Sequence, residues 1–512
     1  MGTDESPPPL ATGYVVGLAA LSVALHVVVN LTTPYGVHRD EFLYVAAGQH
    51  LRFWTSDFPP AIAVLTAIQH ATLGNSLAAL RLASGLAGAA LIVLTALSTR
   101  ALGGRAPAQC LAMVAVLANP LFLRTAHLLQ PVVFDQLCWT AALYALILLC
   151  RSTTRARWCA LGLALGVGLL WKFTILVLVG AIGLALIVTP RRRWLATPGP
   201  WVALVVLSAV GAPSVVGQIR LGFPIVGQMA ALQQGQLVHL GVAEWLTNVV
   251  VLGPTMLLAA IGAAALALNR GFRAFTVVGW SCIIAFATIF LLHGKPYYAA
   301  PVYPTLFAAG ATACVRGAAP RRTAWVVGLA AIVIVAYGSL VLPMALPIVP
   351  PRGMAEYAAA LGLSAPLRTD QGQHLELPQD YADMLGWPQQ TAAVAAVFDS
   401  LPPAERPQTA VLAQNYGEAG ALDFYGPRWG LPPAISTQGT YYLFGPGLRA
   451  GTTLIALGVD SAWLARHYDS VRPAAWVDNP LGVVEERHVP IYLCRSPHQS
   501  LQALWPSLAG RY

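Results

Sequence analysis

The sequence predicts a polytopic α-helical membrane protein that carries an α/β domain at its carboxyl end. Three observations lead to this fold class. Of the 512 residues, 57% are apolar and 10% are charged, whereas an average soluble domain has about 25% charged residues. Long apolar runs recur through residues 1–343, and shorter strand-like and helical runs alternate in residues 344–512. The composition excludes a soluble globular protein, a disordered chain and a nucleic-acid-binding protein.

About eleven apolar runs approach the length of about 20 residues that a membrane-spanning helix needs. They lie near 11–31, 77–98, 107–123, 132–150, 158–171, 173–189, 200–219, 246–268, 274–292, 297–314 and 323–343. Only Trp171 and Lys172 separate the fifth run from the sixth. The first run has no Lys or Arg before it, and further spans follow it. We therefore expect it to remain as an anchor rather than to be cleaved as a signal peptide.

Basic residues are divided unequally between the loops on the two sides of these spans. One set of loops carries 13 arginines, and the alternate set carries six basic residues. Because loops richer in Lys and Arg stay in the cytoplasm, the other set, at 32–76, 124–131, 220–245 and 293–296, is expected to face outward. Eleven spans then place residues 344–512 outside as well. We expect a multi-pass protein of the inner or plasma membrane.

Residues 344–512 are expected to form an extracytoplasmic α/β domain of their own. Strand-like runs at 409–414, 452–458 and 489–495 alternate with helical stretches near 391–399 and 460–467, a pattern typical of such domains. A segment of about 150 residues can bury its own core. With a single cysteine, this segment cannot form an internal disulfide. We expect the domain to cover the mouth of an active site.

Ionisable residues of the apolar part gather at its expected outer side. Beyond the first five residues, residues 1–343 hold five carboxylates, namely Asp40, Glu41, Asp57, Asp135 and Glu244. The only lysines of the chain, Lys172 and Lys295, lie at outer helix ends. Ionisable groups at a membrane are costly and are functional candidates by default. Acids and cations gathered at one face indicate an active site.

Each candidate also has a structural interpretation. The segment His38-Arg-Asp-Glu could begin a helix, with an acid near the positive end of the helix dipole. The further acid Asp57, which follows an amphipathic stretch from Glu41 to Trp54, favours a functional role for this loop.

The candidates within the later spans have structural interpretations too. Asp135 could be a buried acid that is hydrogen-bonded between helices, and Lys172 and Lys295 could be anchors that snorkel to the interface. His127 is expected to be structural rather than catalytic. In the tail, Asn415, Glu418 and Asp423 could contact an acceptor, but we expect them to form turns and helix caps.

The outer cluster suits a group transfer. A carboxylate that acts as general base must reach the hydroxyl it activates, and a departing phosphate needs cations or donors at its oxygens. A donor with its tail in the bilayer and its head at the outer face would meet Lys295, Tyr297 and Tyr298. The layout therefore indicates transfer from a lipid-linked phosphodiester to an outer-face acceptor. A transporter or flippase of lipid-linked saccharides is the alternative, although the sequence shows no clear internal repeat of the kind transporters carry.

Several motifs resemble a known family. The segment His38-Arg-Asp-Glu-Phe-Leu-Tyr-Val-Ala-Ala-Gly-Gln-His-Leu, followed by Asp57-Phe-Pro-Pro, resembles the first outer loop of GT-C glycosyltransferases of family 39 and their relatives. These include protein O-mannosyltransferases and lipid A aminoarabinose transferases, and the bacterial subgroup is the most similar. Later segments resemble family signatures in the same order: Phe134-Asp-Gln-Leu-Cys-Trp, Gly168-Leu-Leu-Trp-Lys-Phe-Thr, Gly294-Lys-Pro-Tyr-Tyr and Asn415-Tyr-Gly-Glu-Ala-Gly.

The resemblance implies a GT-C transmembrane domain over 1–343, a catalytic first outer loop at 32–76, and inverting transfer of a sugar from a polyprenyl-phosphate donor. The acceptor would be a glycolipid, a polysaccharide or a protein. The transfer would proceed either without a metal or with a divalent ion, for which Asp40 and Asp57 are the candidate ligands. The implied residues are Asp40 as base with Glu41 and Asp57 in catalysis, Arg39, Lys172, Lys295, Tyr297 and Tyr298 at the donor phosphate and lipid, and Asp135 and His127 in support.

The sequence departs from the family at two positions. Some relatives have a lysine where this chain has Phe58, and the aminoarabinose transferases have an arginine where it has Leu43. How the donor phosphate is held therefore stays open, and Arg39 and Lys295 are the local substitutes. No CxxC, HExxH or phosphate-cradling glycine motif occurs in the sequence.

Overall fold

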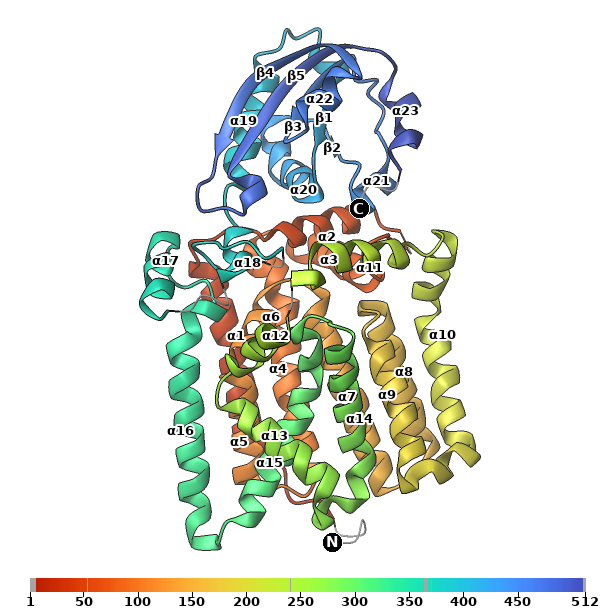
Figure 1. Ribbon diagram of the computed structural model, residues 1–512, viewed down its shortest axis with the longest axis vertical. Helices are drawn as coiled ribbons and strands as arrows, with labels where there is room; N and C mark the ends of the chain where they lie inside the picture. The colour runs from red at the N-terminus through yellow and green to blue at the C-terminus, as the bar shows by residue number, and fades with distance from the viewer. Residues whose placement is uncertain (1–5, 53, 240, 363–366, 370, 510–512) are drawn as a thin grey trace. The chain divides into compact units, whose positions relative to one another are not determined.

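The computed structural model describes residues 6–52, 54–239, 241–362, 367–369 and 371–509 (Figure 1). The chain divides into two compact units, each discontinuous in sequence. The first, here the helical unit, comprises Met1–Thr32, Ala78–Val216 and Gln236–Ile348. The second, here the sheet unit, comprises Thr33–Leu77, Gly217–Gly235 and Val349–Tyr512. The first expected outer loop thus shares a compact unit with the carboxyl-terminal residues.

The helical unit contains the expected membrane spans. Within the described residues, six helical segments are long and apolar enough to cross a bilayer. They are Thr12–Thr32 (α1), Leu77–Ala101 (α4), Pro131–Arg151 (α7), Pro198–Arg220 (α10), Arg270–Leu291 (which ends in α14, Thr276–Leu291) and Arg321–Ala345 (in α16, Pro320–Ala345). The shorter α8 (Arg155–Trp171) and α15 (Tyr303–Gly317) cover two further expected runs.

Three more expected runs form bent helix pairs, which raise the number of candidate spans to nine. The pairs are α5 (Ala106–Leu117) with α6 (Pro120–His127), α9 (Ile175–Val188) with the 3₁₀ helix Pro190–Ala196, and α12 (Val242–Val250) with α13 (Thr255–Leu268). Their bends are 61°, 109° and 103°. A proline stands at or directly before the second helix of each pair. Because proline cannot continue a preceding helix, each break follows from the sequence.

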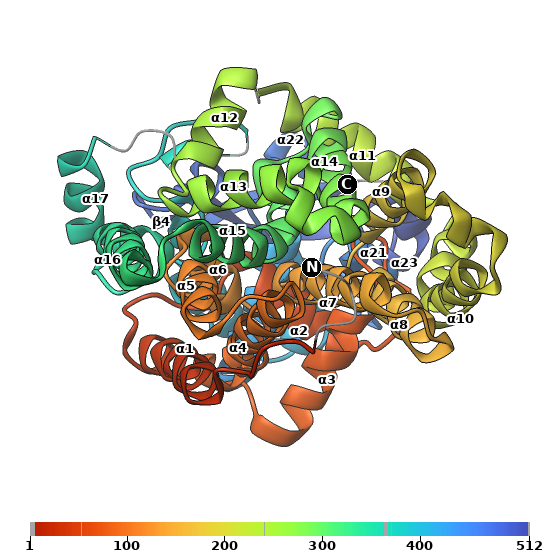
Figure 2. The same ribbon diagram turned by 90° about the horizontal axis from the view of Figure 1, so that it is seen from below.

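Burial distinguishes inner from outer helices of the helical unit. Seen from below in Figure 2, α7 lies inside the unit and α16 lies at its margin. In agreement, 72% of the apolar window of α7 is buried, against 17% of that of α16. Elsewhere in the unit, α13 and α15 pack so closely that a Cβ at Gly262 would collide with the Leu306 carbonyl oxygen. Small residues of this kind let membrane helices approach one another.

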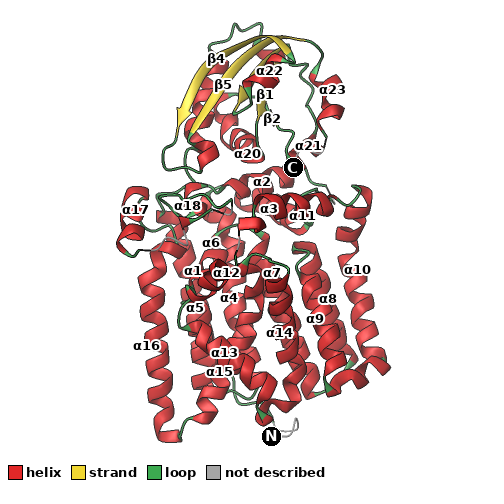
Figure 3. Ribbon diagram, viewed as in Figure 1, coloured by secondary structure: helices red, strands yellow, loops and turns green. Residues whose placement is uncertain are grey.

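The sheet unit holds a five-stranded sheet, whose strands are drawn in yellow in Figure 3. Its strands are β1 (Thr409–Ala413), β2 (Ala434–Ile435), β3 (Thr453–Leu457), β4 (Tyr468–Asp478) and β5 (His488–Pro497). The spatial order is β2-β1-β3-β5-β4. Strand β1 runs parallel to β2 and β3, whereas β5 is antiparallel to β3 and β4. The three expected strands are β1, β3 and β5, and the sheet confirms the small α/β domain.

Helices complete the sheet unit. The segment that follows the first span contributes α2 (Arg39–Gln49). The other helices are α3 (Ala61–Leu73), α11 (Pro224–Gly235), α17 (Pro351–Ala360), α18 (Gln379–Ala382), α19 (Trp387–Asp399), α20 (Tyr416–Tyr425), α21 (Gly439–Phe444), α22 (Ser461–Ala465) and α23 (Leu501–Leu504). Helix α20 packs against α2 through Gly420, where a Cβ would lie 2.5 Å from the Phe42 Cβ. This close approach positions the candidate site.

Candidate active site

The start of α2 is fixed by a reciprocal helix cap. The His38 Nδ1 accepts the Asp40 backbone N–H at 3.1 Å, and the Glu41 Oε2 accepts the His38 backbone N–H at 2.8 Å. This is the capping-box arrangement, with histidine at the N-cap. The Glu41 side chain is fully buried. Glu41, expected among the catalytic acids, is therefore placed where it holds the helix start.

Asp40 lies beside this cap and meets a residue from far along the chain. Its side chain is partly exposed, and its Oδ1 accepts a hydrogen bond from the Tyr416 hydroxyl at 2.8 Å. Burial, and next the Asp40 charge, raise the Tyr416 pKa well above its ordinary value. The phenol therefore keeps its proton at neutral pH and serves as a donor to the Asp40 carboxylate.

A second capping box places Tyr416 at the first position of α20. The Asn415 side chain accepts the backbone N–H groups of Gly417 and Glu418, and the Glu418 carboxylate accepts the Asn415 N–H. Asp423 accepts the Ala434 backbone N–H at 2.8 Å. The capping roles expected of Asn415 and Glu418 are confirmed. Tyr416, which lies between them in sequence, was not selected as a candidate from the sequence.

Arg39 lies among acidic groups of the sheet unit. Its guanidinium carbon is 5.0 Å from the centroid of the Tyr416 ring. Burial lowers the Arg39 pKa. The opposing electrostatic effect is larger, so the net pKa lies above the ordinary value; it comes from Tyr416, Asp383, Glu486 and Asp40. The charges of several acids thus act on Arg39. That placement favours a role in orienting the Asp40 loop over the donor-phosphate role expected from the sequence.

Asp57 is held from two sides. Its Oδ1 accepts the Gln228 Nε2 at 2.8 Å, and its Oδ2 accepts the Thr440 backbone N–H at 2.5 Å. A Cβ at Gly439 would lie 2.5 Å from the same Oδ2, and Gly439 has a φ of +53°, so this approach requires glycine. Asp57 therefore links its loop to α11 and to the start of α21.

Tyr44 relates the two acids of the first loop to each other. It lies one turn after Asp40 in α2 and is buried. Burial raises its pKa well above the ordinary value, and the charges of Asp40, Tyr416 and Asp57 raise it further. All three groups therefore lie within electrostatic reach of one phenol. The charges of Asp40 and Asp57 thus both act on Tyr44, which was not among the residues selected from the sequence.

The donor set around these acids does not fit a divalent metal ion. Across the described residues, no group of three or more His, Cys, Asp or Glu side chains lies close enough to hold one. Both Asp57 oxygens accept hydrogen bonds, from Gln228 and from Thr440. A hard divalent cation needs several free oxygen ligands. We therefore derive no step through a metal at Asp40 or Asp57.

In the helical unit, three residues expected at the donor phosphate and lipid gather together. The Lys172 Nζ lies 5.0 Å from the Tyr297 ring centroid and 4.2 Å from that of Tyr298. Lys172 caps the carboxyl end of α8, and both tyrosines belong to the 3₁₀ helix Pro296–Val302. Such cation–π contacts keep a cation in place without neutralising it. Lys295, just before this helix, is buried, with 8% of its surface exposed.

Asp135 is the acid of the same region. Its Oδ1 accepts the Trp139 Nε1 at 3.0 Å, and its Oδ2 accepts the Thr174 hydroxyl at 2.8 Å. It also interacts electrostatically with Lys172. Asp135 is thus a buried acid that is hydrogen-bonded between helices, as its structural interpretation required.

His127 belongs to a different polar cluster of the helical unit. Its Nε2 accepts the Arg81 Nη1 at 2.9 Å, and a second, longer hydrogen bond joins Arg81 to Asn30 at 3.4 Å. Arg81 is fully buried. Arg81 was not predictable as a member of a polar cluster, because one arginine near the start of an apolar run leaves the run recognisable as a span. His127 has a structural partner here.

Comparisons with known proteins agree with this architecture. Residues 57–216 match the family described as dolichyl-phosphate-mannose-protein mannosyltransferase, whereas no curated protein matches the chain. The chain is similar to ArnT from Cupriavidus metallidurans bound to undecaprenyl phosphate, with a TM-score of 0.60 and 16% identity over 98% of this chain and 100% of that one. For the apo state of ArnT, the TM-score is 0.55 at the same identity and coverage.

The chain is also similar to part of a larger enzyme. The chain is similar to the arabinofuranosyltransferase AftD from Mycobacteria, with a TM-score of 0.50 and 14% identity over 93% of this chain and 40% of that one. Together the matches confirm the resemblance to GT-C glycosyltransferases that the motifs indicated, and they confirm the fold class.

Proposed function

We propose that this GT-C-fold protein transfers a sugar from a polyprenyl-phosphate donor to an acceptor at the outer face of the inner or plasma membrane, with inversion at the sugar. The observation that carries the proposal is the partly exposed Asp40 carboxylate, which accepts a hydrogen bond from a phenol that keeps its proton. The match of residues 57–216 to mannosyltransferases supports the reaction class. The undecaprenyl phosphate in the ArnT structure supports a lipid-phosphate donor.

Asp40 is the general base of the proposed reaction. The acceptor hydroxyl gives its proton to the Asp40 carboxylate while its oxygen attacks the anomeric carbon of the donor sugar. The bond between that carbon and the phosphate oxygen breaks, and polyprenyl phosphate leaves with the bonding electrons. Tyr416 donates to Asp40 and fixes the direction of the carboxylate. Glu41 and Arg39 act as positioning residues, because one caps α2 and the other lies over the Tyr416 ring.

The cations of the helical unit bind the donor phosphate in this proposal. Lys172 is the stronger candidate, because its side chain is partly exposed and two tyrosine rings hold its ammonium in place. Lys295 is the second cation. A charge-assisted hydrogen bond from an ammonium to a phosphate oxygen is about twice as strong as a neutral one, and it stabilises the leaving group as charge develops on it.

Comparing the envelope glycolipids, polysaccharides and glycoproteins of cells with and without the gene by mass spectrometry tests this function. The proposal predicts that one class of glycan loses a single sugar unit and that undecorated acceptor accumulates. Complementation with Asp40→Asn should leave the sugar missing. Loss of the sugar together with lipid-linked sugar accumulating on the cytoplasmic side would instead support a flippase.

A further inference from the structure

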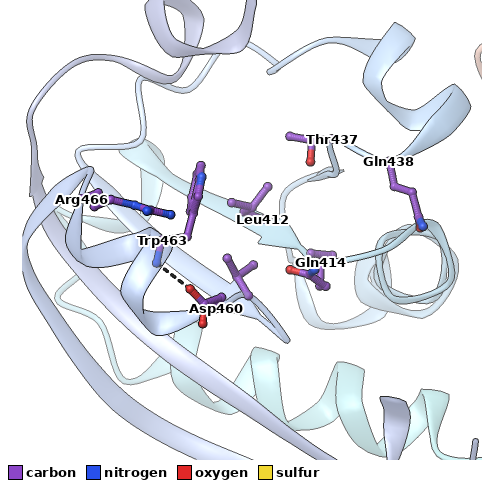
Figure 4. Close-up of a pocket in the computed structure, with 9 residues that line it drawn as sticks. Leu412, Gln414, Thr437, Gln438, Asp460, Trp463 and Arg466 are labelled. Atoms are coloured by element: carbon purple, nitrogen blue, oxygen red, sulfur yellow. Dashed lines mark hydrogen bonds between the residues drawn. The ribbon is translucent and has the colours of Figure 1, made fainter. Parts of the chain in front are cut away.

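A cavity of about 360 Å³ opens in the sheet unit at the carboxyl ends of its three parallel strands (Figure 4). From β1 the chain passes to β2 on one side, and it then returns to β3 on the other side. Ligands of open α/β sheets bind beyond the strand ends, where the strand order reverses in this way. The volume lies within the range of small-molecule sites. This cavity is therefore in the position where such a sheet binds a ligand.

The lining of the cavity has the chemistry that recognises a sugar ring. Leu412 and Trp463, which are 4% and 9% exposed, supply a small apolar part of the lining. Gln414 and Gln438 supply amide donors and acceptors. Figure 4 shows Gln414 and Gln438 across the cavity from Trp463 and Arg466. A pyranose or furanose ring presents apolar C–H faces and hydroxyl edges. A small apolar surface beside amide and charged groups is complementary to both.

The charges of the lining favour a neutral ligand over a phosphate. Arg466 is accompanied by Asp460, whose Oδ1 accepts the Trp463 backbone N–H at 2.7 Å. A phosphate would have to lie near that carboxylate, which repels anions. A hydroxyl-rich, uncharged ring can accept from the guanidinium and donate to the carboxylate. The acid and the base then serve as hydrogen-bonding groups of one sugar site.

The cavity shares residues with the surroundings of the two loop acids. The Gln438 Oε1 accepts the Tyr416 backbone N–H at 3.1 Å, and the Tyr416 hydroxyl donates to Asp40. Two residues after Gln438, the backbone N–H of Thr440 donates to Asp57. A ligand in the cavity would therefore contact the segment that positions both acids.

We propose that this cavity binds a sugar residue of the acceptor, and thus that the acceptor is a glycan or glycolipid rather than a bare protein. The inference rests on the proposed transfer function and adds the class of its acceptor. It also gives the carboxyl-terminal domain a binding role.

Binding of bacterial oligosaccharides to the purified full chain in lipid nanodiscs tests the proposal. An array of oligosaccharides from bacterial envelope polysaccharides supplies the probes, and the best binder is then titrated. The pocket variant combines Gln414→Ala with Arg466→Ala, and the control variant combines Gln389→Ala with Arg472→Ala. All four side chains are exposed, so both variants should fold. The pocket variant should lose at least about tenfold in affinity, whereas the control should stay within about twofold.

Two results would overturn the proposal. One is equal affinity of the pocket variant and the wild type for the oligosaccharide. The other is the absence of any bound oligosaccharide at millimolar concentration. Weaker binding of the polyprenyl-phosphate donor in the pocket variant, with oligosaccharide binding intact, would assign the cavity to the donor sugar and would also contradict the proposal.

The same proteins separate this inference from the proposed function. Asp40→Asn should bind the oligosaccharide like the wild type while it transfers no sugar. If the pocket variant loses the oligosaccharide but the wild type transfers no sugar to it, the cavity assignment holds and the transfer function fails. If the wild type transfers sugar and the pocket variant binds oligosaccharide normally, the function holds and the cavity assignment fails.

Discussion

The Tyr416 hydroxyl donates a 2.8 Å hydrogen bond to the Asp40 carboxylate, although 376 positions separate the two residues in the chain. Two capping boxes, at the starts of α2 and α20, place the residues. Gly417 and Gly420 let the two helices approach, because a Cβ at either would collide with Arg39 or Phe42. The segment 33–77 and the carboxyl-terminal residues therefore build one carboxylate site together.

Removing the phenol should impair the chemical step. Tyr416→Phe keeps the ring under Arg39 but deletes the donor to Asp40. A hydrogen bond to a charged group contributes about 1.5–3 kcal/mol, so kcat should fall about tenfold or more while the donor KM changes little. Steady-state transfer of labelled sugar measures both constants. Tyr492→Phe, on β5, is the matched control. Equal kcat values for the two variants would show that the Tyr416 hydroxyl has no role in the chemical step.

Replacing Lys172 should weaken binding of the donor. Lys172→Ala removes the ammonium held over Tyr297 and Tyr298. Losing a charge-assisted contact of about 1.5–3 kcal/mol should raise the apparent donor KM about ten- to hundredfold and leave acceptor affinity unchanged. Lys172→Arg should retain part of the function, and Lys295→Ala shows the share of the second cation. If both alanine variants keep the donor KM of the wild type, the two lysines act as interfacial anchors and not as ligands of the donor phosphate.

Stability should depend on pH through Asp383. Burial raises its pKa from 3.8 to about 6, against the opposing effect of His38 and Arg39. Its folded pKa lies above its unfolded pKa, so its favourable contribution is complete below about pH 4 and is lost as the pH rises through about 6. The melting temperature should fall over this window, and Asp383→Asn should flatten the fall. The exposed Asp399→Asn should not alter it, and an unchanged slope in Asp383→Asn would refute the assignment.

The orientation of the chain makes a separate prediction. Single cysteines on a cysteine-free background would be exposed to a membrane-impermeant thiol reagent in intact cells. Gln233→Cys and Pro433→Cys should label, whereas Arg105→Cys and Thr153→Cys should label only after the membrane is opened, because arginine-rich loops stay in the cytoplasm. All four side chains are exposed. Labelling of Thr153→Cys in intact cells would reverse the topology and contradict an outer-face reaction.

The elements that were predictable are those specified by local sequence. Each expected apolar run contains a helix. Strands β1 and β3 are short and apolar, and β5 contains the expected run 489–495. Strand β4 was missed because it is an edge strand with few buried residues and a proline, Pro473, at its irregular pairing. Edge strands tolerate proline. Strand β2 has only two residues and gives no pattern at all.

The candidate site was only half predictable for a related reason. Asp40, Asp57 and Lys172 could be selected because charge is rare in an apolar chain. Tyr416 and Tyr44 could not, because neither stands out by composition and each gains its role from contacts between distant segments. One signal was available: the Gly417–Gly420 spacing indicates a helix face that packs closely against a neighbour.

The most direct test of the account is the turnover of Asp40→Asn beside Glu41→Gln. Both are measured as transfer of labelled sugar from a synthetic polyprenyl-phosphate donor by the purified protein in lipid nanodiscs. A general base contributes about 10²–10⁴-fold, so Asp40→Asn should lose turnover by that factor with little change in KM. Glu41→Gln should lose less, because Glu41 caps α2. Turnover of Asp40→Asn within about threefold of wild type would contradict the account, and if Glu41→Gln also stayed active, the flippase alternative would take precedence.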